Sequence, residues 1–311
     1  MHRSSRVPSL VGGLIAAELL LGAGVLRVLH RAGALDRYSV AARADTAPRS
    51  VAAEDVKIAG RAVTVWRPTK GSGPAPLVIF SHGFHGSSKQ STFLMRALAD
   101  HGYLVVAVNH KDAGFGGGRG GAQGWLRPTV PFEEPDRWTD ATYRDRADDV
   151  VAVIEAMKSD SSWSGTADWT RLALAGHSLG GYTVLGLAGA WPSWKISGVK
   201  AVLALSPFCT PYLSKERLGS VTTPVMFQGG TWDYGVTPSV RRSGGAFDVI
   251  TAPAELVDID RAGHFAWTDL NADHQANIVY YSVAFLDKYV KGRTGDDPAL
   301  KRKGVAEVRT K

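Results

Sequence analysis

The chain has 311 residues, of which 44% are hydrophobic, so it is long enough for one large domain with a sizeable core. Its single cysteine, Cys209, excludes an intramolecular disulfide, gives no information about compartment, and is expected to be a packed small side chain. Residues 1–49 and 288–311 carry net charges of +4 and +5, whereas residues 50–287 carry −2. This distribution argues against a nucleic-acid partner and favours solvated or membrane-facing ends.

Residues 1–29 are expected to form a hydrophobic helix outside the folded domain. Val7–Leu26 is mostly apolar, with Glu18 as its one charged residue. This length suits a helix that spans a bilayer, and the arginines before it suit the n-region of a signal peptide. We favour a membrane anchor, with a signal peptide or a helix packed on the domain as alternatives. Anchor and signal both predict an extracytoplasmic protein, membrane-anchored or secreted. Residues 30–53 are expected to be a linker.

Alternating strands and helices predict a catalytic domain over residues 54–291, followed by a basic tail over 292–311. Strands are expected within Val56–Trp66 and at Leu77–Phe80, Leu104–Val108, Leu172–Ala175, Val199–Leu205, Thr223–Gly229 and Ala254–Ile259. Helices are expected at Ser91–His101, Thr142–Lys158 and Tyr182–Ala190. The order implies an α/β fold with a mostly parallel sheet covered by helices on both faces. In such sheets ligands bind beyond the carboxyl ends of the strands.

The segment 113–142 is the least regular part of this domain. Seven glycines fall between Gly114 and Gly124, and no Gly-Lys-Ser/Thr sequence follows them, so a phosphate-binding loop is not indicated. A loop of this length is typical of a functional flap. We expect a flap over the pocket with Phe115, Trp125 or Phe132 as a substrate contact, and an ordinary surface loop is the alternative. The helix that follows begins with charged residues, expected to form ion pairs and docking contacts: Arg144, Arg146, Asp148 and Asp149.

The sequence Gly176-His177-Ser178-Leu179-Gly180 follows an apolar strand and precedes a helix. This is the context in which a G-x-S-x-G pattern places a nucleophilic serine on a tight turn. Ser178 is therefore the predicted nucleophile, with an ordinary glycine turn as the alternative. A serine hydroxyl needs a base, and the base needs an orienting acid.

His264 is the predicted base and Asp233 is the predicted acid. Each falls just after its own apolar strand, so parallel strands would bring both to the same edge as Ser178. The order Ser178, Asp233, His264 is that of an α/β-hydrolase triad. The competing acids are Asp258, inside a strand, and Asp260, four residues from His264; we favour Asp233 over both.

With these motifs in place, the chain resembles the α/β-hydrolase superfamily over about residues 54–290. More closely, it resembles the branch that holds platelet-activating factor acetylhydrolases, dienelactone-hydrolase-like proteins and bacterial cutinase-like esterases. The further matching pieces are Val78–Phe84, Ala99–Tyr103 with Asn109–Asp112, Gly229–Asp233 and Gly263–Phe265. The resemblance implies an oxyanion hole made by the backbone N–H groups of Phe84 and Leu179. It implies no cofactor and no metal.

The predicted function is hydrolysis of carboxylic esters through an acyl-enzyme on Ser178. Small or short-acyl esters are the expected substrates, and lipid esters come into range if the N-terminus holds the protein at a membrane. Phe208 and Trp232 are further candidates for substrate contact, because each lies next to the predicted catalytic edge. A thioesterase or amidase with the same triad is the alternative, followed by a non-catalytic binding module. The oligomeric state does not follow from the sequence.

Overall fold

A nine-stranded sheet organises the part of the chain that the computed structural model describes, residues 51–69, 71, 73–114 and 130–311. The strands lie in the order β1-β2-β4-β3-β5-β6-β7-β8-β9. Their bounds are β1 Ala53–Ile58, β2 Arg61–Trp66, β3 Ala75–Ser81, β4 Leu104–Val108, β5 Ala167–His177, β6 Val199–Leu205, β7 Val225–Gly230, β8 Ala254–Ile259 and β9 Val305–Thr310. The six strands from β4 to β8 in this order are parallel, and the hairpin β1–β2 and strand β9 add antiparallel edges. The predicted mostly parallel sheet is confirmed.

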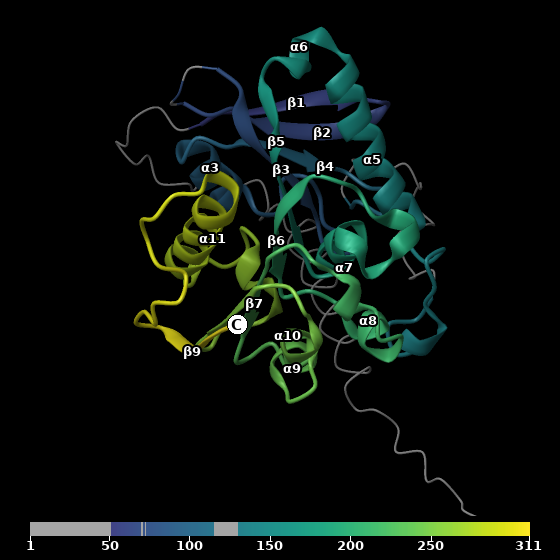
Figure 1. Cartoon of the computed structure of the whole chain (residues 1–311), viewed down its shortest axis with the longest axis vertical. Coiled ribbons are helices and arrows are strands. Elements are labelled where there is room, and N and C mark those ends of the chain that lie inside the picture. Colours follow the sequence, from purple (N-terminus) through teal and green to yellow (C-terminus); the bar gives the residue numbers. More distant parts are fainter. Residues whose placement is uncertain (1–50, 70, 72, 115–129) are drawn as a thin grey trace, which may run out of the picture.

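Helices cover both faces of the sheet. Their bounds are α3 Thr92–Asp100, α5 Arg144–Ser159, α6 Ser161–Ser164, α7 Leu179–Leu185, α8 Thr210–Ser214, α9 Thr237–Arg241, α10 Ala246–Val249 and α11 Gln275–Lys291. Single-turn helices and a short π-helical turn follow or precede them: η1 Pro135–Arg137, η2 Gly186–Ala190, η3 Pro192–Trp194, η4 Leu218–Ser220 and η5 His264–Trp267. Figure 1 shows α3 and α11 on one side of the strands and α5, α7 and α8 on the other.

Strand β3 shows why its apolar run is continuous. Leu77 and Ile79 belong to the core that includes α5 and α7, whereas Val78 and Phe80 belong to the core that includes α3 and α11. All four are fully buried, because successive side chains of a strand point to opposite faces and both faces are covered. This arrangement holds the carboxyl end of β3 in the middle of the sheet, beside the ends of β4 and β5.

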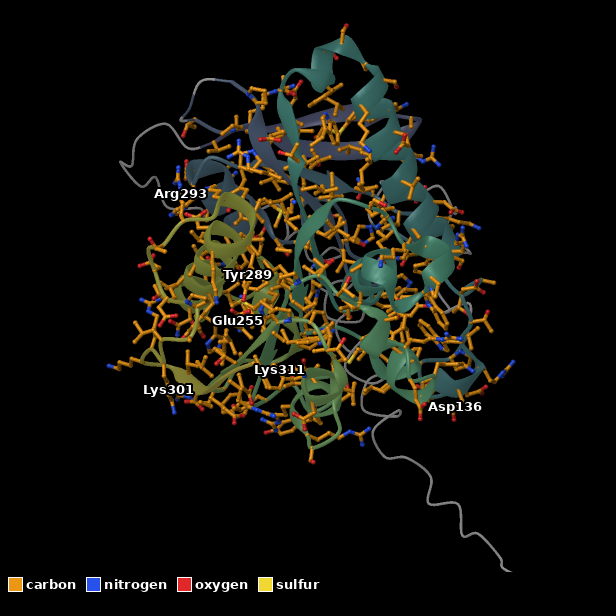
Figure 2. All side chains as sticks on the ribbon, in the orientation of Figure 1. Asp136, Glu255, Tyr289, Arg293, Lys301 and Lys311 are labelled. Carbon is orange, nitrogen blue, oxygen red and sulfur yellow. The ribbon has the colours of Figure 1, made fainter. Side chains whose placement is uncertain are left out.

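Helix α11 is tied to strand β8 by a polar contact as well as by apolar packing. Glu255 in β8 accepts hydrogen bonds at Oε1 from Lys288 Nζ, at 3.0 Å, and from the Tyr289 hydroxyl, at 3.2 Å. Figure 2 shows Glu255 and Tyr289 close together. Burial raises the pKa of the Glu255 carboxyl, and the bonds from Lys288 and Tyr289 offset part of that rise. The contact holds α11, which follows the His264 loop, against β8, which precedes that loop.

The C-terminal segment corrects one sequence prediction. Residues 292–311 are expected to be a tail outside the domain, but Val305–Thr310 form β9 and pair with β8. Lys311 continues the pairing, since its N–H donates to the carbonyl of Ala254 at 2.9 Å. The strand has few buried residues because it lies at an edge of the sheet, so hydrophobic periodicity does not reveal it.

The N-terminal predictions fall mostly outside the described residues. These are the hydrophobic segment 1–29 and the linker 30–53 up to residue 50. Val51 is already buried, in the core that includes Trp66 and helices α3 and α11. Within the residues that the structure describes, no helix combines the length and apolar character needed to cross a bilayer.

Candidate active site

Ser178 lies on a tight turn between β5 and α7. Its backbone has φ 56° and ψ −118°, a conformation that costs a non-glycine residue of the order of 1–3 kcal/mol. The flanking glycines permit the turn. A Cβ on Gly180 would lie 1.9 Å from the carbonyl oxygen of Ser81, and one on Gly176 would lie 2.3 Å from that of Gly180. The close approach of β3, β5 and α7 therefore requires glycine at these positions, as expected for a nucleophile elbow.

His264 reaches Ser178 from the loop after β8. It is the first residue of η5, and its Nε2 lies 2.9 Å from Ser178 Oγ. The carbonyl of His264 accepts a hydrogen bond at 2.9 Å from Nε2 of His177, the residue next to the serine. Both the ring and the backbone of His264 are thus held against the elbow. The side chain is buried, so little water competes for Nε2.

Asp233 follows β7 and lies behind the histidine. Its Oδ2 is 3.3 Å from His264 Nδ1 and accepts a hydrogen bond from the Thr237 hydroxyl at 3.0 Å. Burial alone would raise the pKa of Asp233, but the charge of His264 and the hydrogen bonds from His264, Ser206 and Thr237 outweigh burial and lower it. The carboxylate is therefore kept ionised, as required to orient and stabilise an imidazolium.

The two competing acids have other partners. Asp258 points its carboxylate at Arg241, with Arg241 Nη1 2.6 Å from Oδ2. Asp260 is half exposed and pairs with Arg261 at 3.3 Å. The geometry therefore brings Ser178, His264 and Asp233 together, and not Asp258 or Asp260.

Ser206 is a site residue that the sequence analysis did not identify. It follows β6 directly, and its Oγ is 2.9 Å from His264 Nδ1 and donates to Asp233 Oδ2. It is fully buried, with φ 41°, and its N–H donates to the carbonyl of Gln228 at 2.7 Å. The available signal was its position, since it follows the end of a parallel strand at the same edge as Ser178, Asp233 and His264. A single serine there has no motif that would distinguish it from an ordinary loop residue.

The two predicted oxyanion donors flank the serine. Leu179 is the first residue of α7, where helical N–H groups have no partner within the helix. Phe84 belongs to the loop after β3, which approaches the elbow closely: a Cβ on Gly83 would lie 3.4 Å from Ser178 Cβ. Within the described residues, neither the Phe84 nor the Leu179 N–H donates to another protein group. Both are available to a negatively charged oxygen at Ser178.

The predicted substrate contacts differ in burial and in their distance along the chain from the elbow. Phe208 is buried, with its ring 5.0 Å from those of Phe132 and Trp138, and its N–H donates to the Ser178 carbonyl at 3.0 Å. Phe132 also contacts Phe84, at 5.4 Å between rings, so these aromatic side chains form a wall beside the elbow. Trp232 is 53% exposed, next to Asp233. Phe115, Trp125 and most of the glycine-rich segment lie outside the described residues.

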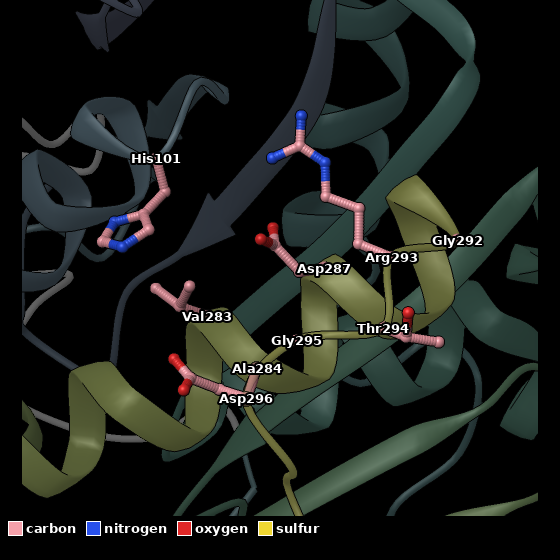
Figure 3. Close-up of a pocket in the computed structure, with 9 residues that line it drawn as sticks. All are labelled: His101, Val283, Ala284, Asp287, Gly292, Arg293, Thr294, Gly295 and Asp296. Atoms are coloured by element: carbon pink, nitrogen blue, oxygen red, sulfur yellow. The ribbon is translucent and has the colours of Figure 1, made fainter.

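A cavity of about 650 Å³ lies away from these residues, between the C-terminal ends of α3 and α11. Figure 3 shows the side chains of His101, Asp287 and Arg293 around it. None of the predicted site residues lines it. Apart from the undescribed residues 1–50, 70, 72 and 115–129, no group of three or more His, Cys, Asp or Glu side chains is arranged to hold a metal ion.

The chain matches a family of known proteins. The family model described as "Serine aminopeptidase, S33" matches residues 72–242, more than half of the chain. Cutinase est2 of Thermobifida alba is 26% identical over 231 residues, which cover 73% of this chain and 63% of that cutinase. Cutinase 1 of Thermobifida cellulosilytica is 25% identical over 221 residues, covering 70% of this chain and 69% of the cutinase.

A bis(hydroxyethyl) terephthalate hydrolase of Streptomyces coelicolor is 23% identical over 256 residues, 79% of this chain and 69% of the relative. The chain spans less than two thirds of the length of Cutinase est2 and of its homologue from the same organism, Cutinase est1. The family match covers β3 to α9, including the serine elbow and Asp233. The chain therefore belongs to the serine aminopeptidase S33 family, with the sheet and serine elbow of an α/β-hydrolase.

Proposed function

We propose that this protein is a serine hydrolase that cleaves carboxylic esters through an acyl-enzyme on Ser178. The observation that carries the proposal is the 2.9 Å approach of His264 Nε2 to Ser178 Oγ, with Asp233 behind the same ring. The cutinase and terephthalate-ester hydrolase relatives support ester cleavage as the reaction class. The substrate is proposed to be a small or short-acyl ester.

In the first half of the reaction, Ser178 Oγ attacks the ester carbonyl while His264 Nε2 takes the hydroxyl proton. The negative charge of Asp233 stabilises the imidazolium, and the N–H groups of Phe84 and Leu179 bind the oxyanion. When the tetrahedral intermediate collapses, the C–O bond to the leaving alcohol breaks and His264 gives its proton to that oxygen. In the second half, His264 deprotonates a water that attacks the acyl-enzyme, and Ser178 regains its proton as the acid leaves.

The test is turnover of p-nitrophenyl acetate by the wild type and by Ser178→Ala. We expect the variant to lose at least 10³-fold in kcat, since the residual rate of enzymes without the nucleophile comes only from binding and the oxyanion hole. Equal rates would contradict the mechanism. Labelling of Ser178 by a fluorophosphonate separates an enzyme from a binding module, because only an activated serine reacts.

Amide cleavage is the second candidate, because the matching family is described as an aminopeptidase. A substrate panel separates the two, with acetyl, butyryl and octanoyl esters, a terephthalate ester, a thioester and amino-acid p-nitroanilides. Faster turnover of the anilides than of every ester would replace our proposal. Longer acyl chains favoured over acetyl would indicate a lipid ester.

The proposal extends to residues 1–29, which we assign as an export signal or membrane anchor on the apolar character of Val7–Leu26. Fractionation of cells that express the full chain, with mass spectrometry of its N-terminus, tests this. An intact Met1 end in the soluble cytoplasmic fraction would exclude both alternatives.

A further inference from the structure

Arg146 is a charged side chain in the core of the molecule, beside the loop that carries Phe84. It lies in α5 and is fully buried, although arginine is seldom buried without partners. Its guanidinium forms a two-point ion pair with Asp112, with Nε 3.0 Å from Oδ1 and Nη2 2.8 Å from Oδ2. The positive charge is thereby balanced, and Nη1 and Nη2 still have N–H groups to donate elsewhere.

The shortest of the remaining contacts are to the backbone of the loop after β3. Arg146 Nη1 donates to the carbonyl of His82 at 2.8 Å, and Nη2 donates to the carbonyl of Gly83 at 3.1 Å. One planar side chain thus binds two successive carbonyls of the loop, so both carbonyls point to the same side of the loop. A guanidinium is suited to this because its N–H groups have fixed directions.

The direction of the loop carbonyls sets the direction of the N–H groups. The peptide bonds here are trans, so the N–H of each peptide points opposite to its C=O. Gly83 shows this: its N–H, opposite the His82 carbonyl, donates to Gln90 Oε1 at 3.0 Å. The amide of Gln90 in turn lies 3.1 Å from His177 Nδ1, so this side of the loop faces the serine elbow.

The same geometry applies to the next peptide. With the Gly83 carbonyl held by Arg146, the N–H of Phe84 points away from the guanidinium and toward the elbow side. We propose that Arg146 is a positioning residue that directs the Phe84 N–H into the oxyanion hole. This inference rests on the proposed ester hydrolysis, in which that N–H stabilises the transition state.

Two other groups share the Gly83 carbonyl. His82 Nδ1 lies 2.6 Å from it, and the N–H of Gly86 donates to it at 3.0 Å. Loss of Arg146 therefore loosens the peptide without freeing it completely. The expected effect is smaller than the 10²- to 10³-fold loss of kcat that follows removal of a whole oxyanion donor.

The test compares Arg146→Lys with Arg144→Lys. A lysine at 146 keeps a positive charge for Asp112 but has one nitrogen, which cannot hold two carbonyls and a carboxylate in a plane. Arg144 lies two residues earlier in the same helix, and its exposed side chain pairs with Asp148 at 3.0 Å, so it is a matched control. The readouts are kcat and KM for p-nitrophenyl acetate, and Ki for a short-chain trifluoromethyl ketone. Ser178 Oγ attacks the carbonyl carbon of this ketone, and the carbonyl oxygen becomes an oxyanion.

We expect Arg146→Lys to lower kcat by about 10- to 30-fold with KM within threefold, and to raise the ketone Ki by a similar factor to the fall in kcat. Arg144→Lys is expected to match the wild type. A role confined to stability would lower the melting temperature and leave kcat and Ki within twofold of wild type, which would overturn the inference. If Arg146→Lys does not fold, the pair Arg146→Met with Asp112→Asn, which leaves no unpaired buried charge, is measured against the same criteria.

The outcome also separates this inference from the proposed function. If Ser178→Ala hydrolyses esters as fast as the wild type, the proposed function fails. If only the wild-type serine supports turnover and the ketone Ki is unmoved by Arg146→Lys, the function stands and the positioning role of Arg146 fails.

Discussion

The hydroxyl of Ser206 lies 2.9 Å from Nδ1 of His264, closer than the 3.3 Å that separates this nitrogen from Asp233 Oδ2. Because Ser206 Oγ also bonds to Asp233 Oδ2, the Nδ1 proton can donate to the hydroxyl while the hydroxyl donates to the carboxylate. The histidine is thus oriented by a serine and an aspartate together.

Removal of this hydroxyl is expected to slow the reaction. Ser206→Ala removes the shorter contact to Nδ1 of His264 and keeps the longer one to Asp233, and a hydrogen bond to a charged group contributes about 1.5–3 kcal/mol. We expect kcat/KM for p-nitrophenyl acetate to fall by roughly 10- to 100-fold. Rates at saturating and subsaturating ester concentrations give kcat and kcat/KM. Ser214→Ala is the matched control, because that hydroxyl donates to the carbonyl of Pro211. Identical kinetics of Ser206→Ala and wild type would show that Asp233 orients the histidine alone.

Asparagine substitutions distinguish Asp233 from the competing acid Asp260. Asp233→Asn removes the charge that stabilises the His264 imidazolium, and we expect a fall in kcat of about 10³- to 10⁴-fold, as in other serine triads. Asp260→Asn changes a half-exposed pair with Arg261 and is expected to leave kcat within twofold. The measurement is kcat for p-nitrophenyl acetate at pH 8. A larger loss in Asp260→Asn than in Asp233→Asn would reassign the acid.

The elbow glycine is expected to be intolerant of a methyl group. Gly180→Ala places a Cβ 1.9 Å from the Ser81 carbonyl oxygen, so β3 and α7 must separate. Overpacking of this kind costs about 1–3 kcal/mol or more in the free energy of unfolding. Gly165→Ala is the control, because φ there is −86° and a Cβ would meet no atom within 4 Å. Urea denaturation of both variants tests the difference, and equal midpoints would contradict the close approach.

The histidine beside the nucleophile makes stability depend on pH. Burial is the main cause that lowers the pKa of His177 from its usual 6.5 to about 3. Between these values the unfolded chain binds a proton at His177 and the folded chain does not, so stability falls as pH falls below 6.5. At pH 5 the loss from this residue is about 2 kcal/mol.

His177→Gln removes that titration and is the variant to compare. Its free energy of unfolding, from urea denaturation at pH 7 and at pH 5, is expected to fall by less than that of the wild type. Subtracting the fall in unfolding free energy of His177→Gln from that of the wild type gives the contribution of His177. The contributions of other buried histidines, such as His82 and His110, whose pKa values burial also lowers, cancel in this difference. Parallel curves for the two proteins would show that His177 does not have a depressed pKa.

The sequence predicts the central strands well, because each is a short apolar run buried on both faces. Leu104–Val108, Val199–Leu205 and Ala254–Ile259 are observed with the expected bounds. Helix α5 shows where the pattern was incomplete. Its buried face includes Arg146 and Asp149 as well as Val150 and Met157, whereas Arg144 and Asp148 pair in solvent. Charge alone does not indicate burial, because a buried charge needs a partner such as Asp112 that is distant in sequence.

The sequence by itself determined the parallel sheet and the edge at which Ser178, Asp233 and His264 meet. It could do so because apolar runs set the strands, and the carboxyl ends of parallel strands share one edge. Only the tertiary structure decided that Ser206 lies between Asp233 and His264, that Arg146 binds the carbonyls of the loop after β3, and that residues 305–310 complete the sheet. Each of these depends on the direction of a hydrogen bond between residues far apart in the chain, and no local pattern records that direction.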